Sequence, residues 1–217
     1  MPARHRERYC GSPRNLSTIS PELCPRCAGI NVHVGLEILS TISRNTQLDQ
    51  FIALLPAGGT VLDIGCGAGS PIARYLIERK FGVEGVDSSP TLIQHCKQSF
   101  PSCPWYVGDM RELELGRTFD GILAWDSFFH LPHDDQRRMF PIFRRHASLN
   151  APLIFTSGTS FGEAIGSYGG EALYHASLSS EEFKSILGEG GFRVVEHVEE
   201  DPRCGGHTVW LAQKMST

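Results

Sequence analysis

The sequence lacks the long apolar segment and the basic excess that mark membrane and nucleic-acid-binding proteins. No apolar run approaches the ~18 residues that a membrane-spanning helix requires, and the N-terminus has no apolar signal-peptide core. The 217 residues carry a formal net charge of −4 at pH 7, whereas nucleic-acid binding normally needs a basic surface. We therefore expect a cytoplasmic protein with no membrane partner and no nucleic-acid partner.

The sequence also lacks the cysteine pattern of a disulfide framework or of a zinc site. Its seven cysteines are scattered and odd in number, which is typical of reduced, cytosolic thiols. Cys24 and Cys27 form a C-x-x-C segment, but a structural zinc site usually needs a second such pair. We predict plain thiols at this pair and no bound metal.

The first 28 residues differ from the rest because they mix arginine and proline without apolar periodicity. This composition predicts a flexible N-terminal arm over residues 1–28, with a lid that closes over a ligand as the alternative. Residues 29–217 are long enough for one domain with a substantial core. A monomer and a homodimer are both compatible with these features.

Beyond the arm, short apolar runs alternate with helical patterns. Helical spacing predicts one or two helices within residues 31–55, ended by residues 56–59. Strands are predicted at residues 60–64, 81–86, 105–107, 119–125, 153–156, 192–198 and 207–212. Helices are predicted at residues 71–80, 89–99, 134–148 and 179–187, the third kinked or split at Pro141. The pattern indicates a doubly wound α/β sheet, mostly parallel but with an antiparallel last strand because its connection is short.

A glycine-rich segment follows the first predicted strand. Glycines at positions 65, 67 and 69 allow a sharp turn and a close backbone approach to a ligand, and the helix behind them offers free N–H groups. Dinucleotide-binding loops use the longer spacing G-x-G-x-x-G. Here the third glycine comes one residue sooner, and Asp63 stands two residues before the first. A carboxylate suits an ammonium and free N–H groups suit an anion.

This D-x-G-x-G-x-G segment resembles the cofactor-binding segment of class I S-adenosylmethionine (SAM)-dependent methyltransferases, which have a Rossmann-like fold. Three further segments at predicted strand ends are similar to the family pattern. They are Gly85-Val86-Asp87-Ser88, Val107-Gly108-Asp109-Met110, and residues 119–131, which end in His130-Leu131. The resemblance extends to about residue 212 and implies SAM as the cofactor, with S-adenosylhomocysteine (SAH) as its product, and a small-molecule acceptor.

The resemblance also implies individual roles. Asp87 would accept hydrogen bonds from the ribose hydroxyls, and Asp109 would accept one from the adenine amino group beside Met110. The implied cofactor-binding residues are Asp63, Gly65, Cys66, Gly67, Gly69, Asp87, Ser88, Asp109, Met110 and Trp125. The alternatives stay open: an aspartate at a strand end can cap the next helix, and Met110 can fill the core.

The acceptor is expected over the fourth and fifth strands, beyond their C-terminal ends. Residues 157–177 follow the fifth strand, and their polar, glycine-rich composition predicts an acceptor-binding lid with glycine hinges. Histidine, with an unperturbed pKa near 6.5, suits a general base, and His207 is a weaker candidate for the same pocket. The candidate catalytic residues are His175, His130 and Tyr174, and the candidate substrate-binding residues are Asp126, Phe129, Phe161 and Tyr174.

Three functions are compatible with these motifs. The first is SAM-dependent methyl transfer to a small molecule. The second is a SAM-binding protein without methyl transfer, either regulatory or of another SAM chemistry. The third is a nicotinamide-dependent oxidoreductase, which the short glycine spacing disfavours. The fourth-strand segment has no Asn/Asp-Pro-Pro-Tyr pattern, so methylation of nucleic-acid amino groups is disfavoured. The acceptor and the methylated atom stay open.

Overall fold

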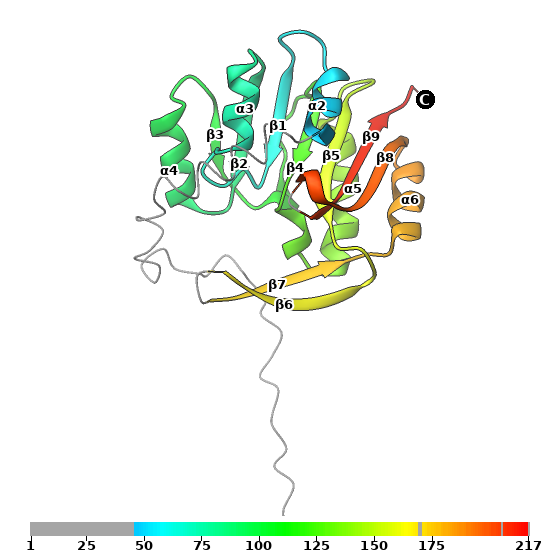
Figure 1. Cartoon of the computed structure of the whole chain (residues 1–217). Coiled ribbons are helices and arrows are strands. Elements are labelled where there is room, and N and C mark those ends of the chain that lie inside the picture. Colours follow the sequence, from blue (N-terminus) through cyan, green and yellow to red (C-terminus); the bar gives the residue numbers. More distant parts are fainter. Residues whose placement is uncertain (1–45, 169–170, 205, 217) are drawn as a thin grey trace, which may run out of the picture.

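A seven-stranded sheet between two layers of helices forms the body of the molecule, and a separate two-stranded hairpin lies across the ends of its central strands (Figure 1). This computed structural model describes residues 46–168, 171–204 and 206–216. The predicted arm at residues 1–28, the Cys24–Cys27 pair and the predicted helical residues 31–45 lie outside the described residues.

The strand order of the sheet is β3-β2-β1-β4-β5-β9-β8. Strands β1 to β5 run parallel to one another, and β9 runs antiparallel to both β5 and β8. This confirms the predicted doubly wound sheet with its antiparallel last strand. The strands are β1 (Thr60–Ile64), β2 (Gly82–Asp87), β3 (Trp105–Val107), β4 (Gly121–Ala124), β5 (Pro152–Ser157), β8 (Phe192–Asp201) and β9 (His207–Lys214).

Side chains alternate along the strands between two cores, one on each face of the sheet. Leu62 and Ile64 of β1 face the core under helix α5 (His133–His146), the α5-side core, which also contains Phe140 and Phe183. Val61 faces the core under helix α3 (Ile72–Glu78), the α3-side core. Period-two alternation into two covered faces explains why the strands are almost continuously apolar. The α-helices are α2 (Thr46–Ala53), α3 (Ile72–Glu78), α4 (Pro90–Ser99), α5 (His133–His146) and α6 (Ser180–Glu189), and short 3₁₀ turns are η4 (Met110–Glu112), η5 (Phe128–His130) and η6 (Pro202–Cys204).

The predicted split of the third helix at Pro141 is wrong, because α5 is one helix from His133 to His146. Proline in a helix interior costs about 3 kcal/mol. On either side of it, Phe140 and Phe143 are 1% and 0% exposed, and burying such a side chain contributes about 1.5–3 kcal/mol. Burial of the flanking aromatic residues therefore outweighs the lost backbone hydrogen bond.

The polar segment after β5 contains two antiparallel strands, β6 (Gly162–Tyr168) and β7 (Glu171–Ser177). The predicted hinge-bearing lid is therefore a hydrogen-bonded hairpin. Figure 1 shows it crossing the edge of the sheet at which β1, β4 and β5 end. Within residues 46–168, 171–204 and 206–216, no helix combines the length and the apolar character needed to cross a membrane.

Candidate functional site

The order of connections reverses between β1 and β4. These strands are neighbours, but the chain leaves β1 toward β2 on one side and β4 toward β5 on the other. Ligands of open α/β sheets bind beyond the carboxyl ends of the strands at such a point. The glycine segment leaves β1 at this point, and so the fold places it where a ligand site is expected.

Two glycines of this loop have different reasons to be glycine. Gly65 and Gly67 have φ values of +78° and +55°, a region that glycine adopts readily and other residues avoid. A Cβ on Gly65 would stand 2.3 Å from the Cβ of Ser127, so Gly65 lets the loop pack on the end of β4. A Cβ on Gly67 would meet no atom within 4 Å, so the backbone of the loop is open to an approaching ligand there.

Asp87 turns toward the glycine loop. One of its oxygens, Oδ2, accepts a hydrogen bond from the Gly67 N–H at 3.0 Å, and Oδ1 accepts one from the Ser89 N–H at 2.8 Å. A carboxylate has about four acceptor positions, so Asp87 keeps capacity for hydroxyl donors. The N–H groups of Gly65 and Cys66 donate to the Val86 carbonyl at 2.8 and 3.0 Å. These two N–H groups of the loop are therefore used within the protein.

Asp63 is 3% exposed at the base of the loop. Burial, and secondly the charge of Asp87, raise the pKa of Asp63 from 3.8 to about 7. A buried carboxyl with a raised pKa favours a nearby cation, which restores the charged form. Asp63 therefore fits the ammonium of SAM, and Asp87 with the open backbone at Gly67 fits its ribose side.

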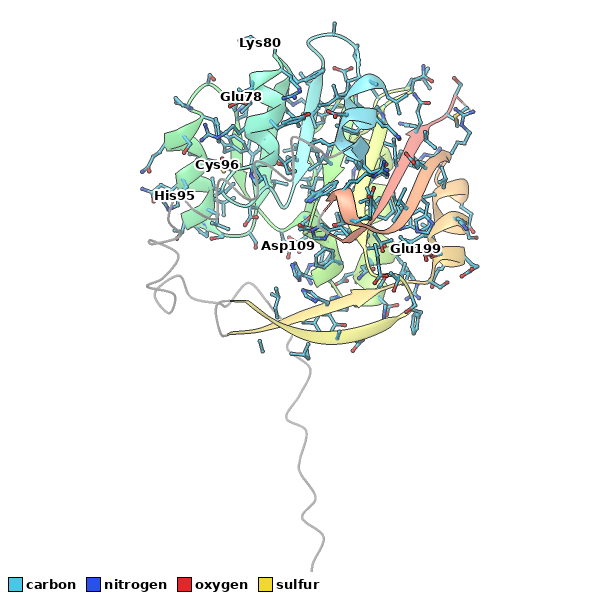
Figure 2. All side chains as sticks on the ribbon, in the orientation of Figure 1. Glu78, Lys80, His95, Cys96, Asp109 and Glu199 are labelled. Atoms are coloured by element: carbon cyan, nitrogen blue, oxygen red, sulfur yellow. The ribbon has the colours of Figure 1, made fainter. Side chains whose placement is uncertain are left out.

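Asp109 lies at the same edge of the sheet (Figure 2), but Arg111 occupies both of its oxygens. Arg111 Nε donates to Asp109 Oδ1 at 2.9 Å, and Arg111 Nη2 donates to Oδ2 at 2.5 Å. Arg111 lowers the pKa of Asp109 and also bonds Asp135 at 3.0 Å. Asp109 caps η4, and Met110 packs against the α5-side core. Contact of this pair with adenine stays a prediction.

The other expected cofactor residues lie around the loop. Cys66 and Trp125 are partly buried and pack against the α3-side core, while Ser88 is exposed next to Asp87. Gly69 has a φ of +73°, and a Cβ there would stand 3.1 Å from the Phe100 ring. Gly69 therefore lets α4 approach the loop closely.

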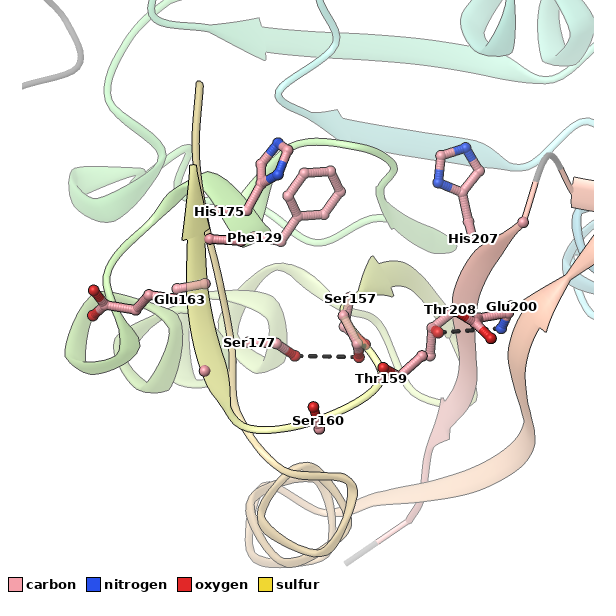
Figure 3. Close-up of a pocket in the computed structure, with 15 residues that line it drawn as sticks. Phe129, Ser157, Thr159, Ser160, Glu163, His175, Ser177, Glu200, His207 and Thr208 are labelled. Atoms are coloured by element: carbon pink, nitrogen blue, oxygen red, sulfur yellow. Dashed lines mark hydrogen bonds between the residues drawn. The ribbon is translucent and has the colours of Figure 1, made fainter. Parts of the chain in front are cut away.

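A cavity of about 480 Å³ lies on the β5 side of this edge, under the hairpin (Figure 3). Its position is where the sequence places the acceptor. The hairpin, the loop after β5 and the beginning of β9 form its walls, and no lysine or arginine is among the described residues that line it. The polar residues lining it are Ser157, Thr159, Ser160, Glu163, His175, Ser177, Glu200, His207 and Thr208.

The hairpin separates two of the candidate catalytic residues. In the β6–β7 register, Tyr174 pairs with Ile165 and His175 pairs with Ala164, and successive strand residues point to opposite faces. His175 lines the cavity. Tyr174 lies on the other face, where partial burial and a hydrogen bond to Glu163 raise its pKa to about 12. The two side chains therefore do not face the same space.

His130 holds the hairpin against the sheet. Its Nδ1 lies 2.9 Å from the Tyr174 carbonyl oxygen, which accepts the hydrogen bond, and its ring centroid lies 4.9 Å from that of His175. Burial lowers the pKa of His130. Phe129 lines the cavity, whereas Phe161 stacks on His133 at 4.4 Å and is 58% exposed.

Asp126 and His207 form a pair that the motif analysis missed. Asp126 Oδ1 lies 3.3 Å from His207 Nδ1, and His207 lines the cavity. Thr156 anchors Asp126, because its Oγ1 accepts from the Asp126 N–H at 2.8 Å and donates to Asp126 Oδ1 at 3.2 Å. The sequence signal that could have indicated this pair was an aspartate at the end of the fourth strand and a histidine at the start of the last strand.

Comparisons with known proteins agree with this geometry. Residues 61–148 match the family model described as "Methyltransferase domain". A "dTDP-4-amino-2,3,4,6-tetradeoxy-D-glucose N,N-dimethyltransferase" from Saccharopolyspora spinosa is 31% identical over 94 residues, which cover 42% of this chain and 37% of that protein. An "O-methyltransferase" from Pyrenophora dematioidea is 25% identical over 189 residues, 77% of this chain and 70% of that protein. The match thus spans little more than a third of the first relative.

A solved structure shares the fold of the described residues. SAM-bound CalS10, "an amino pentose methyltransferase" from Micromonospora echinaspora, superposes with a TM-score of 0.65 at 17% identity, covering 98% of this chain and 100% of that chain. The expected fold is confirmed. Residues 61–148 therefore match a methyltransferase domain, and the described residues have the Rossmann-like fold of class I methyltransferases.

Proposed function

We propose that this chain transfers the methyl group of SAM to a small molecule bound in the cavity under the hairpin. The observation that carries the proposal is the arrangement at one sheet edge. The glycine loop with Asp63 and Asp87 lies on one side of the reversal between β1 and β4, and the cavity lies on the other side. Cofactor and acceptor would meet over the end of β4.

The residues of this chain act in the proposal mainly by positioning. SAM supplies an electrophilic methyl group when it is bound. Asp63 would hold the ammonium and Asp87 the ribose hydroxyls, while Asp109 and Met110 remain the proposed adenine contacts. The cavity wall would hold the acceptor atom about 3 Å from the methyl and in line with the bond that breaks, and such positioning contributes about 7–11 kcal/mol to catalysis.

The charges of the cavity indicate which acceptors fit. Glu200 and five hydroxyl side chains line it, without a lysine or an arginine among the described lining residues. Glu163 is also a lining residue, but its carboxylate is turned toward Tyr174 and His133 on the other face of the hairpin. A carboxylate acceptor would meet repulsion with no fixed cation to offset it. We infer that the acceptor is neutral or cationic and presents a hydroxyl or an amine. The printed names of the relatives, an N,N-dimethyltransferase and an O-methyltransferase, accord with this class.

Location and assembly remain part of the proposal. The scattered cysteines and the net charge of −4 support a cytoplasmic protein that binds no nucleic acid. We propose residues 29–217 as the catalytic unit, as a monomer or a homodimer. Sedimentation of the full chain would distinguish the two states.

Calorimetric titration with SAM tests the proposed function. Hydrogen bonds to a charged group contribute about 1.5–3 kcal/mol, so Asp87→Asn is expected to weaken SAM binding by roughly 10- to 100-fold. The new amide side chain would still offer an oxygen to the Gly67 N–H. The control is Asp134→Asn, at a carboxylate on α5 whose side chain is 83% exposed. Absence of SAM binding by the unaltered chain, or saturation by NAD instead of SAM, would contradict the proposal.

A further inference from the structure

We propose that His207, held by Asp126, is the base that takes the proton from the acceptor as the methyl group is transferred. The inference rests on the proposed function and assigns a catalytic residue within it. His207 Nδ1 lies 3.3 Å from Asp126 Oδ1. With Nδ1–H directed at the carboxylate, the lone pair of His207 stands on Nε2, and this is the tautomer that a general base uses.

The backbone holds both members of the pair in place. Asp126 adopts a φ of +47°, which is uncommon outside glycine, and Thr156 fixes it through the hydrogen bonds at 2.8 and 3.2 Å. His207 begins β9, where Thr208 Oγ1 accepts from the Glu200 N–H at 3.3 Å. Strained backbone that neighbouring groups maintain is frequent at functional sites.

The pair stands at the boundary between the two halves of the proposed site. Asp126 follows the end of β4, which neighbours β1 and its glycine loop. The Trp125 ring meets the His207 ring edge-on at 6.1 Å. Figure 3 shows His207 on one side of the cavity, with His175 and Phe129 on the other. Of the two histidines lining the cavity, His207 is the one that contacts Asp126, which follows β4, the strand next to β1 and its glycine loop.

The opposite wall has a different chemistry. His175 packs edge-on against Phe129 at 5.2 Å and beside His130 at 4.9 Å, and in the described part of the chain it forms no ion pair. His130 uses Nδ1 to bind the Tyr174 carbonyl. A second positive charge would be unfavourable on two adjacent rings. This wall therefore shapes the cavity. His207 is the cavity histidine that has a carboxylate beside it.

The step balances without any further reactant. The acceptor gives its hydroxyl or ammonium proton to His207 Nε2, and its oxygen or nitrogen pair forms a bond to the methyl carbon. The methyl–sulfur bond breaks, and its electron pair stays on the sulfur of SAH. His207 becomes an imidazolium beside the Asp126 carboxylate, and it returns the proton to solvent. Asp126 is a positioning residue that stabilises this charge.

The titratable groups around Asp126 and His207 support an interaction between the charges of these two residues. The titratable groups on the facing elements are Asp126 after β4, His130 in η5, His175 on β7, and Glu200 at the end of β8. Burial raises the pKa of Asp126, and a positive charge on His207 opposes that rise. Each group therefore favours the charged form of the other.

Histidine NMR on the full chain tests the pair without any acceptor. A hydrogen bond to a carboxylate is shorter and roughly twice as strong as one to a neutral amide, so Asp126→Asn is expected to move the Nδ1–H resonance of His207 upfield or to remove it. Asparagine tolerates positive φ well, so the fold is kept. The matched control is Glu163→Gln, whose carboxylate lies 3.5 Å from His133 Nδ1; it leaves His207 unshifted. A His207 Nδ1–H resonance that is unchanged in Asp126→Asn overturns the proposal.

Turnover to SAH tests the role of the base, with catechol and glucosamine as the hydroxyl and amine probes. His207→Gln is expected to lower kcat by about 10²- to 10⁴-fold. Its calorimetric affinity for SAM stays as in the unaltered chain. His175→Gln is expected to raise KM for the probe more than it lowers kcat.

Full kcat in His207→Gln, or an equal loss of kcat in His175→Gln with an unchanged KM, overturns the assignment. Failure of the proposed function has a different signature. In that case the unaltered chain does not bind SAM in the calorimeter, whereas the His207 Nδ1–H resonance still responds to Asp126→Asn.

Discussion

Replacing Asp63 by asparagine is expected to stabilise the empty protein and to weaken its binding of SAM. Asp63 is 3% exposed, and its pKa is raised from 3.8 to about 7, mainly by burial and also by Asp87. The folded state therefore binds the proton more tightly than the unfolded state. The stability that this proton provides is present at low pH and is lost as the pH rises from about 4 to about 7.

The magnitude follows from the two pKa values. Each pKa unit corresponds to 1.36 kcal/mol, so ionising Asp63 costs the empty fold at most about 4 kcal/mol at pH 8. Asp63→Asn removes this cost and should raise the free energy of unfolding at pH 8 by up to that amount, with no gain at pH 4. Thermal and urea denaturation at both pH values measure the difference.

Binding of SAM should show the opposite preference. With a pKa of about 7, about 90% of Asp63 is ionised at pH 8 and about 10% at pH 6. If the ionised form binds the ammonium, affinity for SAM falls up to about tenfold between pH 8 and pH 6, and Asp63→Asn binds weakly with little pH dependence. Calorimetry at pH 6, 7 and 8 checks this. Equal SAM affinity at all three values in the unaltered chain refutes the reasoning.

Three substitutions test the packing around the site. Gly85→Ala would place a Cβ 2.4 Å from the Trp105 ring and 2.7 Å from Cys66 Sγ, so we expect a loss of about 1–3 kcal/mol in urea unfolding. In Gly188→Ala the new Cβ meets no atom within 4 Å on α6, so thermal unfolding should show a gain of about 0.5–1 kcal/mol. Ser89→Ala removes the hydrogen bond that Ser89 Oγ accepts from the Leu92 N–H at 3.4 Å and should lower the free energy of unfolding by about 1 kcal/mol. For each variant, a change of stability of the opposite sign contradicts the packing or capping described for that residue.

The elements that sequence predicts best are those whose pattern is local. Residues 60–64 and 105–107 are the strands β1 and β3 with the predicted bounds, because buried parallel strands are short apolar runs. Ser89, the first residue of the helix predicted at residues 89–99, caps α4, because capping depends on one side chain and the next turn. Gly65 has a positive φ, which agrees with the predicted sharp turn, because glycine spacing reports backbone conformation directly.

Features that depend on distant parts of the chain were not predictable in this way. Glycines at positions 162 and 166 obscure the alternation of β6, so a hairpin resembled a flexible loop. Asp126 and His207 meet because β9 inserts beside β5 in antiparallel register, and no local pattern encodes that neighbourhood. Tyr174 and His175 look equivalent in sequence, but the β6–β7 register separates them.

The insertion of β9 between β5 and β8 also sets an order of assembly during synthesis. Strands β1 to β4 and the glycine loop are complete once residue 124 has left the ribosome, whereas one wall of the cavity is supplied by residues 207–214. Pairings between distant segments form late because loop closure costs entropy. We expect the nascent chain to form its cofactor loop first and to gain an enclosed acceptor chamber only when this late strand is in place.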